Sequence, residues 1–218
     1  MLMQRSARGI SLIEILIGLA ILGIAMAWAI PSYSVWMQNL QIRNMAESII
    51  SGLQTARTEA ISRNGLVEFV LTDVDMVVAN RGSDVAVIGN DNGRNWMVRA
   101  VRPAGPPNYN FVTGRDRSEG SQHATVQAGD ASFGDDRYAV TFDSFGRQRT
   151  APNGLVQNID GSNQITKICV KSSRLTAAAG ARLLEINISV SGQVKMCDPS
   201  VVSPTDPRRC LTPAPRCS

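Results

Sequence analysis

The chain has 218 residues and a formal net charge of +4, and 44% of its residues are hydrophobic, so it is long enough to form a domain with a core of its own. This modest charge does not by itself require a nucleic-acid partner. The sequence contains one histidine, and it lacks a G-x-S-x-G elbow, a phosphate loop and a dinucleotide fingerprint. We therefore expect no catalytic residues, no cofactor and no metal.

An unbroken apolar run begins near the N-terminus. It extends from Ile10 to Ile30, and its only strongly polar members are Ser11 and Glu14. As a helix rising ~1.5 Å per residue, the run spans roughly 30 Å, which matches the hydrocarbon core of a bilayer. A carboxylate inside such a helix costs at least ~2.5 kcal/mol, so Glu14 is expected to be functional and to need a partner.

A short basic leader precedes the run. Arg5 and Arg8 lie before Gly9, and a cut between Gly9 and Ile10 removes both and creates a new amine on Ile10. This stretch resembles the class III signal of type IV prepilins and type II secretion pseudopilins. The resemblance implies cleavage between Gly9 and Ile10 by prepilin peptidase, N-methylation of Ile10, and pairing of Glu14 with the terminal amine of a neighbouring subunit during filament assembly.

An ordinary secretory signal is the alternative, because basic residues followed by an apolar stretch and small residues also describe one. Cleavage sites of the A-x-A type exist at 25–27 and 27–29. A plain signal anchor on a periplasmic protein is a further reading. Glu14 within the apolar core, Gly9 at the end of the leader, and a helical pattern that continues past the A-x-A sites favour the prepilin reading.

Beyond the run the pattern stays helical and becomes amphipathic. Pro31 is expected to kink the helix. Arg63-Asn64-Gly65 supplies a left-handed stop, so one helix of about 50 residues is predicted. Its apolar positions recur mostly every three or four residues: Tyr33, Trp36, Leu40, Met45, Ile49, Leu53, Ala56 and Ala60.

From Leu66 onward, β-branched residues separated by glycine, asparagine and aspartate predict short strands. The segments Arg102–Gly120 and Thr150–Asn163 are rich in Gly, Pro and Asn, and we expect exposed loops there. The predicted strands are Leu66–Leu71, Met76–Ala79, Trp96–Val101, Ala124–Gln127, Tyr138–Phe142, Ile165–Val170, Leu183–Val190 and Gln193–Cys197.

A second resemblance concerns the end of the helix and two later turns. The segment T-A-R-T-E-A-I-S-R-N-G (55–65), followed by a V-x-F-V strand, resembles the GspH/FimT group of minor pseudopilins and minor pilins. V-T-F-D-S-F-G-R (140–147) and I-S-V-S-G-Q-V (188–194) resemble that group's two closing glycine turns. The resemblance implies an α+β fold of the type IV pilin-like lollipop kind, a long N-terminal helix, transmembrane and then amphipathic, packed on an antiparallel β-sheet domain.

The same resemblance implies four parts: a leader (1–9), a transmembrane half-helix (10–30), an amphipathic half-helix (31–64) and a periplasmic β-rich domain (65–218). It implies a structural subunit, not an enzyme, of a type IV pilus or type II secretion pseudopilus that takes part in filament assembly and protein secretion. Its expected partners are other pilin or pseudopilin subunits, the prepilin peptidase/N-methyltransferase and the inner-membrane assembly platform. The expected location is the bacterial inner membrane, crossed once, with the C-terminal domain in the periplasm, before incorporation into a pilus or pseudopilus.

The cysteines indicate an oxidising compartment, because Cys169, Cys197, Cys210 and Cys217 all lie in the final third of the chain. Four cysteines permit three pairings. We favour Cys169 with Cys197, joining neighbouring strands, and Cys210 with Cys217, closing a small loop. The absence of C-x-x-C argues against a redox site. Zinc binding is the alternative, although His123 is far from the cysteines in sequence.

Two arginines raise a second functional hypothesis. Arg147 and Arg149 follow Gly146 at a spacing that places both on one side of an extended strand, where they can reach successive phosphates. The G-R-x-R element resembles the DNA-contacting motif of FimT-branch pilins that serve natural transformation, so DNA binding is an alternative function. Glycine followed by arginine also suits turn geometry alone.

Overall fold

The computed structural model describes residues 10–76, 89–101, 109–129, 137–149 and 165–210. The chain divides into two compact units, Met1–Met37 and Gln38–Ser218, and each is considered by itself. One helix, α1 (Leu12–Ser62), occupies most of the N-terminal quarter. It ends as the sequence predicts, because Asn64 adopts a left-handed φ of 48° and the N–H of Gly65 donates to the carbonyl of Ala60 at 3.1 Å.

The apolar side chains in the first half of α1 are exposed. In the described residues no single helix is both long and apolar enough to cross a membrane, but Leu12–Ala27 and Ser32–Ser62, bent by 42°, meet that test as a pair. Pro31 falls in the break between these two segments. That Pro31 causes the bend stays a prediction. The large apolar side chains that are at least half exposed along this stretch are Leu12, Ile13, Ile15, Leu16, Ile17, Leu19, Ile21, Leu22, Ile24 and Met26.

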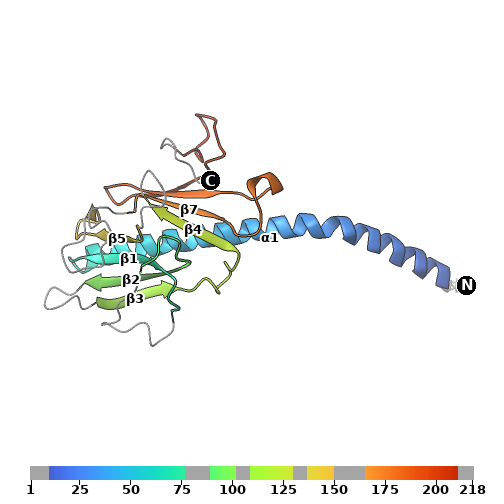
Figure 1. Cartoon of the computed structure of the whole chain (residues 1–218), viewed down its shortest axis with the longest axis horizontal. Coiled ribbons are helices and arrows are strands. Elements are labelled where there is room, and N and C mark those ends of the chain that lie inside the picture. The colour runs from blue at the N-terminus through green and yellow to red at the C-terminus, as the bar shows by residue number, and fades with distance from the viewer. Residues whose placement is uncertain (1–9, 77–88, 102–108, 130–136, 150–164, 211–218) are drawn as a thin grey trace, which may run out of the picture. The chain divides into compact units, whose positions relative to one another are not determined.

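Two antiparallel sheets follow α1 (Figure 1). The five-stranded sheet has the order β3-β2-β1-β5-β6, with β1 (Val67–Thr72), β2 (Asn95–Val101), β3 (Tyr109–Arg115), β5 (Ala139–Phe142) and β6 (Gln148–Arg149). The four-stranded sheet has the order β4-β7-β8-β9, with β4 (Ala124–Gly129), β7 (Lys167–Ser172), β8 (Leu184–Ile188) and β9 (Val194–Cys197); a short 3-10 helix, η2 (Ala177–Ala179), lies between β7 and β8.

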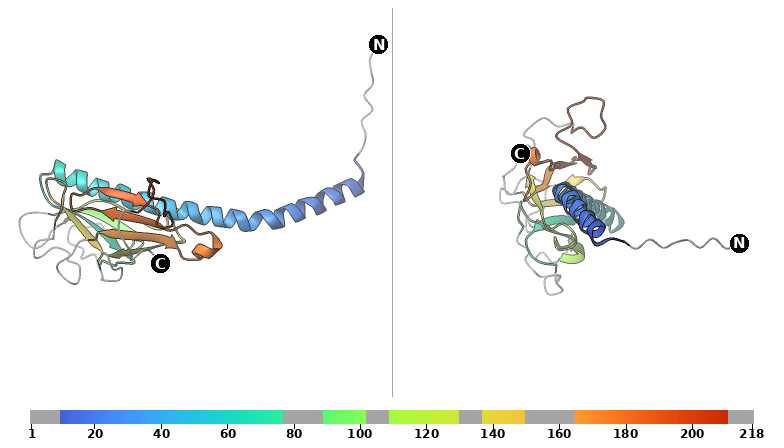
Figure 2. Two further views of the ribbon diagram at one scale, coloured as in Figure 1. Left: turned by 90° about the horizontal axis from the view of Figure 1, so that it is seen from above. Right: turned by 90° about the vertical axis from the view of Figure 1, so that its right-hand side faces the viewer.

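The second half of α1 lies along one face of the strands (Figure 2) and shares a single core with both sheets. Gly52 lets the helix backbone approach the sheet, because a Cβ there would meet the Trp96 ring at 2.8 Å. Trp96 stacks on Phe69 at 5.7 Å between centroids, and its indole N–H donates to Ser48 Oγ at 2.9 Å. The helix residues in this core are Ile42, Met45, Ala46, Ile49, Leu53, Ala56 and Ala60. The predicted apolar stripe is therefore confirmed from Met45 onward, whereas Tyr33 and Trp36 are exposed.

A charged pair is buried within the five-stranded sheet. Glu68 on β1 is directly opposite Arg99 on β2, and Arg99 Nε lies 2.8 Å from Glu68 Oε2. The Arg99 guanidinium also stacks over the ring of Tyr109, 3.7 Å from its centroid. Burial raises the pKa of Glu68, and the neighbouring Arg99 lowers it only in part.

These elements confirm the predicted α+β class, a long N-terminal helix packed on antiparallel strands as in type IV pilins. One predicted loop is wrong. Within Arg102–Gly120, residues Tyr109–Arg115 form β3, since pairing with β2 outweighs the weak strand propensity of asparagine and glycine. Gly114 fits because a Cβ there would meet the Trp96 carbonyl oxygen at 2.9 Å.

Three other predicted segments fall wholly or partly outside the described residues. Met76 is buried but belongs to no strand, and the rest of Met76–Ala79 is not described. The predicted loop Thr150–Asn163 and the leader 1–9 also lie outside the described residues. The remaining predicted strands are confirmed, with ends that differ by one or two residues.

Candidate functional site

Glu14 is the acidic residue of the first turn of α1. Its side chain is exposed, and its carboxylate has no hydrogen bond or ion pair in the described part of the chain. The side chains around it are the exposed apolar residues of the helix. Within a bilayer, an isolated carboxylate on such an apolar surface is costly unless another molecule supplies a partner. Gly9, the residue before the predicted cleavage site, lies outside the described residues.

A second site forms where two turns meet the end of α1. The turn between β5 and β6 contains Gly146 with φ of 71°, and the turn between β8 and β9 contains Gly192 with φ of 78°. Arg57 Nε donates to the carbonyl of Gly146 at 3.0 Å, and Gln148 N donates to the carbonyl of Val190 at 3.0 Å. We call Arg57, Gly146 and Gly192 the closing-turn junction.

The close approach at this junction explains both glycines. A Cβ on Gly192 would come within 1.9 Å of the Gly146 carbonyl oxygen, and a Cβ on Gly146 would meet the Arg57 side chain at 2.9 Å. Both glycines also have positive φ values, which side chains disfavour. The three segments on which the family resemblance rests therefore meet at one place, although they are far apart in the sequence.

Asp143 organises the first of these turns. Its Oδ1 accepts hydrogen bonds from the backbone N–H groups of Phe145 and Arg147, both at 2.9 Å. Its Oδ2 accepts from Nε and Nη2 of Arg147 at 3.2 and 3.1 Å. Partial burial by itself raises the pKa of Asp143, but the hydrogen bonds from Arg147 and Phe145 outweigh it and hold the pKa below its usual value.

Arg147 and Arg149 are predicted site residues, whereas the sequence predicts no role for Asp143 or Arg57. Arg147 lies just before β6, its side chain is 61% exposed, and it is paired with Asp143. Arg149 lies within β6, opposite Thr141, and is also exposed. Phe145 is 74% exposed, with its ring centroid 5.0 Å from the Arg147 guanidinium carbon. The aspartate at the start of D-S-F-G is the signal that could have revealed the turn, because aspartate commonly binds the backbone two residues on.

The favoured cysteine pairing is wrong. Cys197 is bonded to Cys210, with the Cα atoms 5.0 Å apart. Cys169 on β7 and Cys197 on β9 are not neighbours, because β8 lies between them and places Glu185 opposite both. Strands two places apart in a sheet are ~10 Å apart, beyond the reach of a disulfide. Cys169 is itself disulfide-bonded, and Cys217 lies outside the described residues.

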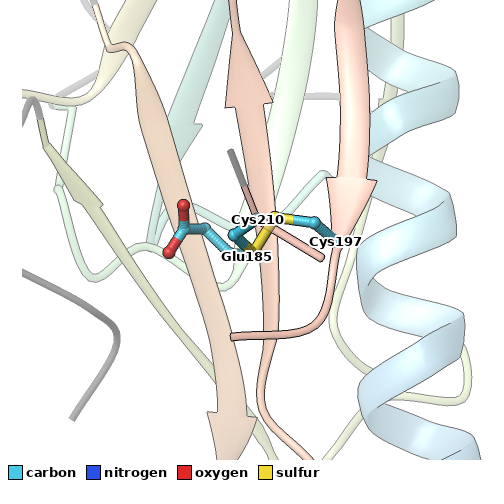
Figure 3. Close-up of side chains that lie close together, drawn as sticks. All are labelled: Glu185, Cys197 and Cys210. Carbon is cyan, nitrogen blue, oxygen red and sulfur yellow. A yellow bond between two sulfur atoms is a disulfide. The ribbon is translucent and has the colours of Figure 1, made fainter. Parts of the chain in front are cut away.

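Glu185, Cys197 and Cys210 bring possible ligand atoms within 4.8 Å of one another (Figure 3). Both sulfur atoms belong to the disulfide, as Figure 3 shows, and metal binding by cysteine needs thiolates. The cluster is therefore a covalent clip at the end of β9. His123, considered with the zinc alternative, instead donates its backbone N–H to Gln41 Oε1 at 3.1 Å.

An N-terminal helix that buries its second half against antiparallel sheets and leaves its apolar first half bare is the architecture of a pilin-type subunit. The family model "Type II transport protein GspH" matches residues 45–192, and the model "Prokaryotic N-terminal methylation motif" matches residues 4–30. The chain belongs to the GspH family, as a minor pseudopilin of the GspH/FimT type. Membership of this structural pilin family implies interaction with other pilin subunits, and the N-terminal motif indicates membrane anchoring.

Solved structures were compared as well. Two crystal forms of the type IV minor pilin FimU of Pseudomonas aeruginosa (strain PAO1) are similar to this chain. One is 17% identical, covers 71% of this chain and 90% of its own, and has a TM-score of 0.37. The other is 16% identical in sequence; the match covers 74% of this chain and 91% of the FimU chain, with a TM-score of 0.40. No curated protein matches the chain.

Proposed function

We propose that this chain is a structural subunit of a type IV pilus or a type II secretion pseudopilus, with no catalytic step of its own. It waits in the bacterial inner membrane, held by residues 10–30, with residues 65–218 in the periplasm. Prepilin peptidase cuts between Gly9 and Ile10 and methylates the new amine. The assembly platform then moves the subunit into a filament that acts in protein secretion or pilus assembly.

The observation that carries this proposal is the carboxylate of Glu14, which has no partner among the described residues and lies on the apolar residues 10–30, here called the stem. Counting from Ile10, Glu14 is the fifth residue of the mature chain. The Ile10 amine and the Glu14 carboxylate are each costly in a low-dielectric environment, and each offsets the other when two subunits meet.

The stem also has the surface that helix packing requires. A Cβ at Gly18 or Gly23 would find nothing within 4 Å, so both positions leave room for another helix. Small residues at such positions allow close approach between helices within a membrane or filament. Lateral packing of stems and pairing at Glu14 then act together to hold each subunit in place.

The test begins with the N-terminus of the protein purified from membranes. Mass spectrometry is expected to find methylated Ile10 as the first residue. A terminus near Trp28 or Ser32 would instead show ordinary signal cleavage and overturn the proposal. The second measurement is incorporation into sheared filaments: Glu14→Gln is expected to reduce it at least tenfold, whereas Ser11→Ala, a matched polar change in the same run, leaves it unchanged. Equal incorporation by both variants would remove the role of Glu14.

A DNA-binding role is the second candidate. The exposed Phe145 ring lies beside the exposed Arg147, and Arg149 is exposed two residues further on. Proteins that bind single-stranded DNA combine such groups, with an aromatic face for stacking on bases and cations for phosphates. The pairing of Arg147 with Asp143 opposes this role, because the ion pair offsets the charge that a phosphate needs.

Gel retardation of the detergent-solubilised chain over a salt series tests DNA binding. Arg147→Ala/Arg149→Ala is expected to weaken binding and flatten the salt dependence, whereas Arg43→Ala/Arg115→Ala, an equal loss of charge at two arginines already paired with Glu47 and Glu119, is not. Asp143→Asn releases Arg147 and is expected to strengthen binding. Equal binding by both double variants would eliminate the site.

A further inference from the structure

The loop between β7 and β8 carries two arginines whose charge no group in the described residues offsets. Arg174 and Arg182 are exposed, and neither side chain has an ion pair or hydrogen bond in the described part of the chain. The sequence from 165 to 184 contains no acidic residue. By contrast, Arg43 on α1 is paired with Glu47 at 2.7 Å. The β7–β8 loop is therefore a local concentration of uncompensated positive charge.

Side chains of α1 hold this loop in place. The side chain of Asn39 makes two bonds to its backbone, donating to the carbonyl of Gly180 at 3.1 Å and accepting from the N–H of Arg182 at 2.8 Å. Ser172 Oγ donates to Gln38 Oε1 at 2.7 Å and accepts from the N–H of Arg174 at 3.1 Å. Figure 1 shows the short helix of this loop, η2, beside α1. The backbone of Arg182 is thus anchored directly at Asn39, and that of Arg174 is anchored at Gln38 through the Ser172 hydroxyl.

Few residues separate Asn39 from the predicted membrane segment in the sequence. Asn39 follows Ile30 by nine residues, which span at most ~14 Å along a helix. The headgroup layer on each side of the hydrocarbon core is itself roughly 5–8 Å thick. Tyr33 and Trp36 lie in this interval, 59% and 55% exposed, with ring centroids 5.7 Å apart. Exposed aromatic residues at this position are typical of a membrane–water interface.

We propose that Arg174 and Arg182 bind the phosphate groups of anionic phospholipids while the subunit resides in the inner membrane. This inference rests on the proposed function, because it needs residues 10–30 in the bilayer. Two guanidiniums donate to phosphate oxygens through several N–H groups. Asn39 holds the backbone of Arg182, and Ser172 holds the backbone of Arg174. Each arginine near an anionic surface is expected to strengthen the association about fivefold.

The consequence concerns assembly. A subunit whose β7–β8 loop is bound to headgroups is held against the membrane, and extraction into a filament must break these contacts together with those of the stem. The loop then becomes free to meet a neighbouring subunit. Lipid binding by Arg174 and Arg182 therefore favours the membrane-embedded subunit over the subunit assembled in a filament.

The experiment uses the full chain in lipid nanodiscs and follows hydrogen–deuterium exchange in peptides that cover 172–183. We expect exchange to be at least about fivefold slower in nanodiscs that contain phosphatidylglycerol than in nanodiscs of phosphatidylcholine alone. The difference is expected to disappear in Arg174→Gln/Arg182→Gln and in about 0.5 M salt. Arg147→Gln/Arg149→Gln, the matched control, is expected to keep it, because the Arg57 contact to Gly146 lies about 27 Å further along α1 than Asn39.

Two failures are distinguishable. If the chain inserts into nanodiscs and exchange of this loop does not depend on lipid charge, or if both double variants respond alike, the lipid inference is wrong and the proposed function stands. If the chain does not enter nanodiscs at all, the stem does not anchor it, and both the proposed function and this inference are overturned.

Discussion

Arg57 Nε donates a hydrogen bond of 3.0 Å to the carbonyl oxygen of Gly146. This bond joins the end of α1 to the β5–β6 turn, and Gly192 of the β8–β9 turn packs on the same carbonyl. Three segments that resemble the GspH/FimT group thus meet at one backbone oxygen. The family pattern at these positions therefore has a structural explanation, independent of any ligand.

Gly192→Ala is expected to destabilise the protein by about 3 kcal/mol or more, because it adds a steric clash to an unfavourable backbone conformation. The added Cβ would come within 1.9 Å of the Gly146 oxygen at a residue whose φ is 78°. Urea unfolding followed by circular dichroism measures the loss.

Gly120→Ala is the matched control for this change. Gly120 has φ of 94°, but a Cβ there would meet nothing within 4 Å, so the variant reports the backbone term of about 1–2 kcal/mol alone. If both variants lost equal stability, the close approach of the two turns would have no energetic effect.

Removing the Cys197–Cys210 disulfide is expected to cost about 3 kcal/mol, because the bond closes a loop with a sequence separation of 13. The double variant Cys197→Ser/Cys210→Ser, compared with the wild type by urea unfolding, measures this cost. Peptide mapping without reduction is expected to recover Cys197 linked to Cys210. A peptide that links Cys169 to Cys197 would contradict the order of the strands.

The ion pair of Asp143 gives a pH dependence with a definite sign. The pKa of Asp143 is lower in the folded protein than its value of 3.8 in the unfolded chain. The ionised carboxylate therefore stabilises the fold at any pH above 3.8, and this stabilisation is lost as the pH falls through the folded-state pKa. Asp143→Asn is expected to lose about 1–2 kcal/mol at pH 7 and progressively less toward pH 3. A difference from the wild type that stays constant with pH would refute this account.

The buried Glu68–Arg99 pair predicts a strong asymmetry between single and double variants. Arg99→Met leaves the buried Glu68 carboxylate uncompensated and is expected to cost about 3–5 kcal/mol at pH 7, whereas Glu68→Leu/Arg99→Met costs much less. The measurement is the free energy of unfolding of each variant.

The pH dependence of this pair runs opposite to that of Asp143. Burial raises the pKa of Glu68, so its folded state binds a proton more readily than the unfolded chain, and stability falls as the pH rises through the folded value. The loss of unfolding free energy in Arg99→Met is therefore expected to shrink as the pH falls from 7 toward 4.5, the ordinary pKa of glutamate. A loss that grew with acidity would contradict the assignment.

Much of the fold could be predicted from local patterns. The helix ends where Arg63-Asn64-Gly65 predicts, and most strands appear where β-branched runs occur. The exception is β3, whose glycine and asparagine content is typical of a loop. Pairing with β2 and the stacking of Arg99 on Tyr109 stabilise it as a strand, and neither contact leaves a signal in the local sequence.

The candidate sites divide in the same way. The apolar run, Gly9 and Glu14 are local features, because the partners proposed for them, a membrane, a peptidase and another subunit, lie outside this fold. The sequence alone therefore determined the family and the place of the stem. Strand order is a property of the whole sheet, and it excludes a bond between Cys169 and Cys197 because β8 lies between them. The bridge between Asp198 and Arg209 then brings Cys210 to Cys197. Only the tertiary structure could pair Arg147 with Asp143 and fix the β7–β8 loop to Asn39, because these contacts depend on distances that folding sets.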